Sequence, residues 1–232
     1  MPTIVVSLGG SLLFDKEGRF NLKDAKKLAG MLVSVHSRGI RLIVITGGGR
    51  RAREYANAAR RKHGTEFDAD REAIRATREN ARAIIGLMGS AAYGRVLEKF
   101  DDADNAFKRN KIAVGAGLLE GLTTDAVSVL FAEKARAAAV VNLGDTDGIY
   151  SSDPKKHKNA KRFTKMTHRE LVDLAIKSDS RLAGTHFVFD LVAAKLAARS
   201  GMELRFVDGR DLGESEMAIL GKKFSGTVVK SK

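Results

Sequence analysis

The sequence predicts an α/β protein with a mainly parallel β-sheet that is covered by helices on both faces. Apolar, β-rich runs alternate along the chain with segments of helical periodicity, which is typical of β-α-β units. The run 41–46 is almost continuously apolar, as expected for a parallel strand buried on both faces. The chain has 232 residues, of which 44% are hydrophobic, so we expect a single domain over residues 1–232.

The first half of the chain is expected to start with a strand at residues 3–8, where Ile and Val dominate. A helix over residues 21–38 follows, because apolar residues recur there every three or four positions. The strand 41–46 comes next and leads into a glycine turn. The same helical spacing then predicts helices at residues 50–62, 70–88 and 91–100.

The second half of the chain repeats this alternation of strands and helices. Short apolar runs predict strands at residues 111–114, 138–143 and 203–207, with a terminal edge strand at 225–230. Helical spacing predicts helices at residues 123–136, 167–177 and 187–200. The polar and basic segment 153–165 follows neither pattern, so we expect a loop or a hairpin there.

The composition is strongly basic, with 41 Lys and Arg residues against 28 Asp and Glu and a formal net charge of +13. This excess favours anionic partners such as nucleotides, although dispersed basic residues are also typical of an ordinary solvated surface. The absence of Cys excludes thiol catalysis, disulfides and Cys-based metal sites. No apolar run reaches the roughly 18 residues of a membrane helix. The N-terminus lacks the basic region of a signal peptide, so we expect a cytoplasmic protein without a membrane partner.

Three glycine-rich segments follow predicted strands: Gly9-Gly10-Ser11, Gly47-Gly48-Gly49 and residues 115–121. Ligands of open α/β sheets bind at the carboxyl ends of the strands. Glycines there let the backbone approach a phosphate, and the next helix offers free N–H groups. The alternative for each segment is a tight turn without a ligand. The spacing fits neither a P-loop nor a dinucleotide fingerprint.

Two further motifs are more specific. T-T-D-A-V at residues 123–127 places a capping threonine and then Asp125 at the start of a helix, where a carboxylate also suits the helix dipole. D-G-I-Y-S-S-D-P-K-K at residues 147–156 comes directly after a buried strand. Acidic, small and aromatic residues at the exit of a strand are poor core material, and they suit a nucleotide-binding loop.

Together these turns and motifs resemble the amino acid kinase superfamily, and in particular its archaeal uridylate (UMP) kinase branch. The resemblance runs over nearly the whole chain, into the late segments D-L-V-A-A-K and A-R-S-G. It implies a three-layer αβα sandwich. It also implies ATP with Mg²⁺, transfer of the γ-phosphoryl group to UMP in pyrimidine nucleotide biosynthesis, and a homohexamer built as a trimer of dimers. The Mg²⁺ would be carried by ATP, so no metal ligand of the protein is expected.

The resemblance also implies the residues of both substrate sites. The ATP site would comprise Ser7, Leu8, Gly9, Gly10, Ser11, Gly49, Arg53, Gly144, Asp145, Tyr150 and Asp153. The UMP site would comprise Gly48, Asp70, Leu118, Leu119, Glu120, Gly121, Leu122, Thr123 and Thr124, with Asp70 on the ribose. Asp125 would organise the groups around the transferring phosphoryl group.

The chain departs from the resembled pattern at several positions. Much of the superfamily has Lys at the position of Ser7 and another near Asp190, so Arg50 and Arg53 are the candidate catalytic cations here. Gly144-Asp145 stands where the branch often has Thr-Asn. Residues 119–122 replace a His-Pro-Gly-His loop, which makes the loop around the nucleobase less polar.

Two alternatives stay open. One is another small-molecule kinase of the same superfamily, for isopentenyl phosphate, carbamate or acetylglutamate; the first of these usually has His before the G-G-G turn, where this chain has Thr46. The other is a non-catalytic protein that binds nucleotides or nucleic acid. Aromatic residues are only 6% of the chain and Trp is absent, so any nucleic-acid binding is expected to be non-specific.

Overall fold

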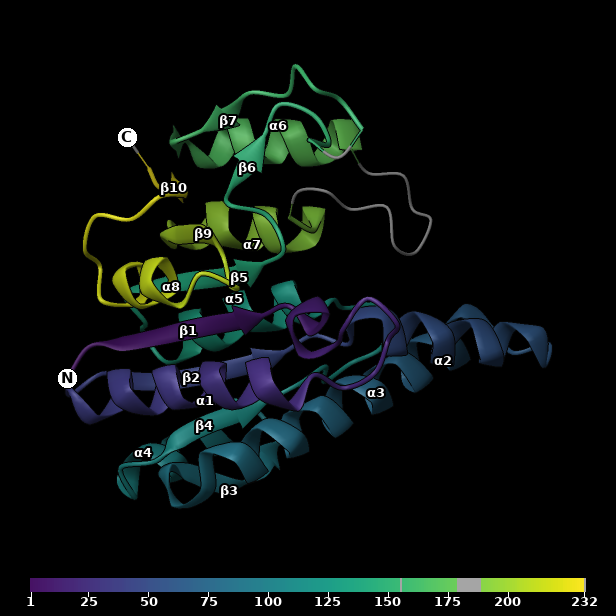
Figure 1. Cartoon of the computed structure of the whole chain (residues 1–232). Helices are drawn as coiled ribbons and strands as arrows, with labels where there is room; N and C mark the ends of the chain where they lie inside the picture. The colour runs from purple at the N-terminus through teal and green to yellow at the C-terminus, as the bar shows by residue number, and fades with distance from the viewer. Residues whose placement is uncertain (155, 179–188, 232) are drawn as a thin grey trace.

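A computed structural model describes residues 1–154, 156–178 and 189–231 (Figure 1). The strands are β1 (Thr3–Leu8), β2 (Arg41–Thr46), β3 (Ala92–Leu97), β4 (Ile112–Gly115), β5 (Ala139–Gly144), β6 (Ile149–Tyr150), β7 (Arg162–Phe163), β8 (Lys165–Met166), β9 (Leu204–Asp208) and β10 (Thr227–Val229). The helices are α1 (Leu22–Ser37), α2 (Gly49–Arg61), α3 (Glu66–Met88), α4 (Asp102–Lys108), α5 (Thr124–Lys134), α6 (His168–Ser178), α7 (Leu191–Ser200) and α8 (Leu212–Ile219), with 3₁₀ turns η1 (Gly10–Leu13) and η2 (Gly89–Ala91).

Eight of the strands form one sheet in the order β3-β4-β2-β1-β5-β9-β10-β8, and β6 pairs with β7 in a separate antiparallel ribbon. Within the described part of the sheet, only the pair of β9 and β10 runs antiparallel. The predicted mainly parallel sheet is therefore confirmed. The β6–β7 ribbon also confirms a hairpin: β6 precedes the polar segment 153–165, and β7 lies near its end.

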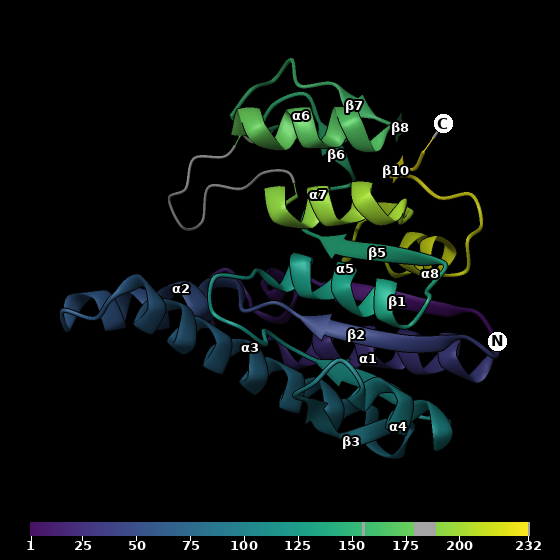
Figure 2. The same ribbon diagram turned by 180° about the vertical axis from the view of Figure 1, so that it is seen from behind.

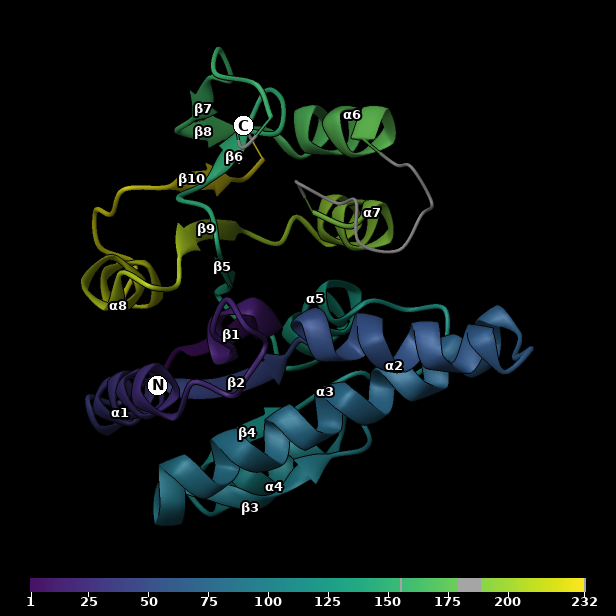
Figure 3. The same cartoon turned by 45° about the vertical axis from the view of Figure 1, so that its right-hand side comes forward.

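Helices cover both faces of the sheet, which confirms the three-layer αβα architecture. One apolar core joins α1, α3 and α8 to one face, and a second core joins α4, α5, α6 and α7 to the other. Figure 3 shows α1 and α8 on one side of the sheet and α5, α6 and α7 on the opposite side. Every residue of β1 is buried because successive side chains enter different cores: Ile4 and Val6 face the first, and Val5 faces the second.

Helices α2 and α3 form a hairpin that extends beyond the edge of the sheet, as seen from both sides in Figures 1 and 2. Helix α3 begins at Glu66, four residues before the predicted start. Thr65 accepts a hydrogen bond from the Asp68 amide, and the Asp68 carboxylate accepts one from the Thr65 amide. This capping box satisfies the first free N–H groups of the helix, so Asp70 does not cap it.

The prediction of a helix over residues 91–100 is wrong, because this segment is mostly strand β3 at the edge of the sheet. Gly94 adopts φ +86°, which is incompatible with a right-handed helix. The middle of β3 is exposed, so its residues lack the alternation of a half-buried strand. Helices α4 and α8 were not predicted, since each spans only about two turns. The Asp211 cap with Glu214 three residues later was a usable signal for α8.

The prediction that the C-terminal strand lies at the edge of the sheet is wrong. Strand β10 lies between β9 and β8. Its residue Thr227 is fully buried and joins the sheet to the β6–β7 ribbon. The Thr227 hydroxyl accepts a hydrogen bond from the Ile149 amide (2.9 Å) and donates to the Phe163 carbonyl. Helix α7 starts at Leu191; residues 187 and 188 of the predicted helix lie outside the described residues.

None of the helices in the described ranges is both long and apolar enough to cross a membrane.

Two glycines, one within α1 and one just after it, allow a matched test of the C-terminal boundary of this helix. Gly30 lies inside α1, and Gly39 follows the helix with φ +88°; a Cβ at either position would meet no atom within 4 Å. We expect Gly30→Ala to raise the free energy of unfolding by about 0.5–1 kcal/mol, because Ala has the higher helix propensity. Gly39→Ala should lower it by about 1 kcal/mol, because the left-handed backbone strains a Cβ. Urea denaturation of both variants measures the two changes, and equal changes would contradict the assigned helix end.

Candidate active site

The carboxyl ends of β1, β2 and β5 lie side by side, in register. Leu8 at the end of β1 pairs with Thr46 of β2 on one side and Leu143 of β5 on the other. The Gly47 amide donates to the Leu8 carbonyl (2.8 Å), and the Gly9 amide donates to the Leu143 carbonyl (2.9 Å). The turns after the three strands therefore form one continuous edge, where ligands of open α/β sheets bind.

The two glycine turns pack directly against each other. A Cβ on Gly10 would lie 2.3 Å from the Gly49 nitrogen, and one on Gly49 would lie 2.6 Å from the Gly10 carbonyl carbon. Gly49 also has φ +60°, a backbone conformation that favours glycine. Only glycine fits both positions, so backbone N–H groups of two turns are brought together at one place. Such a cradle suits the phosphates of a nucleotide.

Hydrogen bonds to helix α3 hold the second glycine turn, residues 47–49, in place. The buried Asn80 side chain donates from Nδ2 to the Gly47 carbonyl (2.8 Å), and the Thr46 hydroxyl donates to the Thr77 carbonyl (3.0 Å). Asn80 was not predicted as a site residue. A single amide on the buried face of a long helix was the available signal, because such a group needs a partner.

Asp125 stands at the start of α5, beside the glycine turns. Thr123 caps this helix by accepting from the Ala126 amide, as predicted for one of the two threonines. Ser7 Oγ from β1 donates to Asp125 Oδ1 (2.8 Å), and Asn142 Nδ2 from β5 donates to the same oxygen (3.0 Å). Two neutral donors from different strands thus orient the carboxylate. Asn142 was missed, although an amide inside the apolar run 139–143 was a usable signal.

These elements enclose a cavity of about 630 Å³ at the carboxyl end of the sheet. From the predicted site it brings together Ser7, Leu8, Gly9, Gly10, Ser11, Gly48, Gly49, Arg53, Thr124, Asp125, Gly144, Asp145 and Asp153. Residues without a predicted role also line it: Gly47, Asn142, Thr146, Gly148, Ile149, Pro154, Lys156 and Phe206. Phe206 comes from the distant strand β9, so nothing local in the sequence could connect it to the cavity.

The two candidate arginines lie differently. Arg53 of α2 lines the cavity beside Gly49. Arg50 is not among the described residues that line it. Its Nε donates to Glu54 (2.8 Å), and its side chain packs against Gly18. The geometry therefore favours Arg53 over Arg50 as a cation for a ligand in this cavity.

In the predicted UMP loop 118–124, Thr124 lines the cavity, whereas residues 118–123 are not among its described lining residues. The loop is tied at two points. The Gly121 amide donates to Asp70 Oδ2 (2.9 Å), which links the loop to α3. The Thr123 hydroxyl donates to Asp190 Oδ2 (3.1 Å), which links the loop to the N-cap residue of α7. Between these ties the Leu119 side chain is 57% exposed. Leu118 and Glu120 line a second hollow of about 460 Å³, together with arginines of α3.

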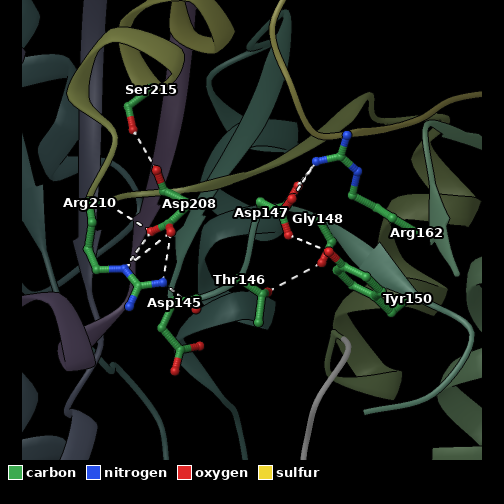
Figure 4. A network of polar contacts seen from close by, with 9 residues as sticks. All are labelled: Asp145, Thr146, Asp147, Gly148, Tyr150, Arg162, Asp208, Arg210 and Ser215. Carbon is green, nitrogen blue, oxygen red and sulfur yellow. Dashed lines mark hydrogen bonds and ion pairs between the residues drawn. The ribbon is translucent and has the colours of Figure 1, made fainter. Parts of the chain in front are cut away.

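Tyr150 is not among the described lining residues of the main cavity and supports its wall instead (Figure 4). Its phenol donates to Asp147 Oδ1 (2.6 Å), and Arg162 pairs with the other oxygen of that carboxylate. Nearby, Arg210 contacts both carboxylate oxygens of Asp208 and donates to the Asp145 carbonyl (2.9 Å). This network joins the loop after β5 to the β6–β7 ribbon and to the end of β9.

Comparison with known proteins identifies the family to which this architecture belongs. The sequence profile of the amino acid kinase family matches residues 2–208. The chain belongs to the amino acid kinase family. A family relative, uridylate kinase of Methanocorpusculum labreanum, is 39% identical over 229 residues, which cover 99% of this chain and 96% of that protein. Uridylate kinase of Methanospirillum hungatei is 40% identical, with 99% and 95% covered.

A solved structure extends this likeness from sequence to shape. Uridylate kinase from Archaeoglobus fulgidus has a TM-score of 0.84 and 32% identity to this chain. The match covers 99% of this chain and 100% of that one. The chain therefore shares its architecture with a uridylate kinase over 99% of its length.

The Tyr150 contact predicts a pH-dependent signal. Its hydrogen bond to Asp147, and secondly burial, raise the pKa of Tyr150 above the ordinary value of 10.0. The contribution of this hydrogen bond to the stability of the folded protein is therefore complete below the pKa that Tyr150 has in the unfolded chain. It is lost as the pH rises through the higher pKa of Tyr150 in the folded protein. The chain has three Tyr and no Trp, so ultraviolet absorbance follows phenolate formation directly. We expect Tyr150→Phe to remove the phase that titrates at the highest pH. The control Tyr93→Phe should keep that phase, and its loss there would contradict the assignment.

Proposed function

We propose that this protein is a UMP kinase, which transfers the γ-phosphoryl group of ATP to UMP and releases ADP and UDP. The observation that carries the proposal is the full-length likeness to curated uridylate kinases at 39% and 40% identity over 99% of the chain. The cavity supports it independently, because glycine turns, one arginine and an oriented aspartate meet at the carboxyl end of the sheet. These are the groups that phosphoryl transfer needs.

The backbone cradle would hold the phosphates. N–H groups of Gly10, Gly48 and Gly49 belong to two turns in direct contact, where any Cβ on Gly10 would collide with backbone. The Gly9 amide is already bonded to the Leu143 carbonyl, so Gly9 would contribute by letting the backbone approach the phosphates. The polar contacts of such a cradle are fixed before the ligand arrives, so no reorganisation is required during the reaction. The ATP-side residues Ser7 to Ser11 and the acceptor-side residue Gly48 line the same cavity. This shared lining supports a direct transfer between two substrates bound side by side.

No general base is needed, because the phosphate of UMP is already ionised. Mg²⁺, carried by ATP, would neutralise charge on the β- and γ-phosphates when bound, and the open cradle has room for such a complex. Asp125 would orient hydrogen-bonding and cationic groups around the reacting phosphoryl group. Arg53 would neutralise charge from the α2 side, and Asp70 with residues 118–124 would surround uridine.

The proposal extends to the setting of the enzyme. We place the reaction in pyrimidine nucleotide biosynthesis in the cytoplasm. Each subunit would be one domain over residues 1–232, and six subunits would form a homohexamer built as a trimer of dimers. These points rest on the resemblance of the motifs to the uridylate kinase branch.

An acceptor panel tests the proposed function. ADP release, measured with a coupled assay, should be much faster with UMP than with CMP, AMP, GMP or isopentenyl phosphate. The physical reason is that a site built to hydrogen-bond one base leaves polar groups unpaired with another. A non-nucleotide acceptor that outperformed UMP would indicate another small-molecule kinase of the family. Failure of every acceptor would favour a non-catalytic nucleotide-binding protein.

Asp125→Asn separates a catalytic role from a structural one. The amide keeps an oxygen that accepts from Ser7 and Asn142, while the negative charge is lost. We expect kcat to fall about 10²-fold or more, because loss of one preorganised electrostatic group costs about 2.7–4 kcal/mol in the barrier. The melting temperature should stay nearly constant, since a charge in a first helical turn contributes only about 0.3–1 kcal/mol.

The matched control is Asp104→Asn, which removes an exposed first-turn carboxylate of α4. This variant should show the same small change in melting temperature and the parent rate of UMP phosphorylation. If Asp125→Asn also retained the parent rate, Asp125 would only complement the dipole of α5.

A further inference from the structure

The main cavity is lined by more carboxylates than cationic side chains, although a ligand with several phosphates would bring negative charge. Three carboxylates line it: Asp125, Asp145 and Asp153. Among the described lining residues, only Arg53 and Lys156 are cationic. ATP and UMP both bring negative charge, so each of these cations carries a large share of the neutralisation.

The two cations approach the cavity from different elements. Arg53 lies on α2, next to the second glycine turn. Lys156 lies in the loop that joins β6 to β7, on the wall formed by Asp153 and Pro154. The Lys156 and His157 amides both donate to the Asp153 carbonyl (3.1 and 2.9 Å), so a local turn fixes the backbone at this point.

The Lys156 side chain itself is held only loosely. Its Nζ lies 3.9 Å from Asp153 Oδ2, and the side chain is 74% exposed. An exposed pair of this kind contributes only about 0–1 kcal/mol, so it does not commit the ammonium group to the carboxylate. Lysine is a flexible point charge with three donors, which suits a phosphate that arrives in the cavity.

We propose that Lys156 binds the phosphates of ATP and forms, with Arg53 on the other wall, a two-sided cationic clamp. This inference rests on the proposed use of ATP but not on the identity of the acceptor. Arg53 would neutralise the phosphates from the cradle side, and Lys156 would neutralise them from the ribbon side.

Lys156→Met tests the clamp by binding rather than by turnover. ATP with Mg²⁺, and adenosine as the ligand without phosphates, are titrated into the protein by calorimetry in the absence of acceptor. We expect the ATP dissociation constant to rise about 10-fold, which corresponds to about 1.4 kcal/mol, while adenosine affinity stays constant. Lys156→Arg should restore most of the ATP affinity.

Lys158→Met is the matched control, because Lys158 is exposed in the same loop and is not among the described lining residues. This variant should bind ATP like the parent. An equal loss with Lys158→Met would indicate a general electrostatic field instead of a clamp. An equal loss of ATP and adenosine affinity would place Lys156 at the ribose or base, and an unchanged ATP affinity would remove it from the site.

The binding experiment also separates this inference from the proposed function. If UMP failed as the acceptor, the titration with ATP would still decide the role of Lys156. If the parent protein bound no ATP at all, both the clamp and an ATP-dependent kinase would be overturned.

Discussion

The close approach of two backbone turns determines the geometry of the nucleotide cavity. Gly10 and Gly49 touch without side chains between them, and this contact is possible because β1, β2 and β5 end in register. A shift of one strand by one residue would separate the turns and would reverse which core each side chain enters. The buried apolar side chains of the sheet therefore stabilise the fold and, through the register, also align the N–H groups of the cavity.

Asp125 shows how the sheet controls charge as well as position. Two of its donors, Ser7 and Asn142, come from the adjacent strands β1 and β5 and are neutral. The carboxylate is thus held in one orientation beside groups that would receive phosphates. The cationic side chains Arg53 and Lys156 come from outside the sheet, on α2 and on the ribbon loop. The rigid sheet orients the negative group, and peripheral elements supply the positive ones.

Much of this arrangement could be predicted from the sequence, because it depends on local patterns. Apolar runs followed by glycines predicted β1 and β2 with their turns, and the T-T-D motif predicted Asp125 at a capped helix start. The misses have physical reasons. Strand β3 is exposed in its middle and contains Gly94, so its pattern resembled a helix. Phe206 and Asn80 reach the site only through tertiary packing, and Arg50 could be separated from Arg53 only by the direction of its side chain.

The position of β10 has a consequence for synthesis of the chain. Strand β8 pairs in the sheet with β10, and the ribbon that carries Ile149 is joined to the sheet through Thr227. These contacts cannot form until residues 227–229 have emerged from the ribosome. The N-terminal strands can assemble earlier, because domains begin to fold during translation. The wall of the cavity next to Lys156 is thus completed after the N-terminal strands, so a nascent chain acquires its whole nucleotide site only once β10 has been made.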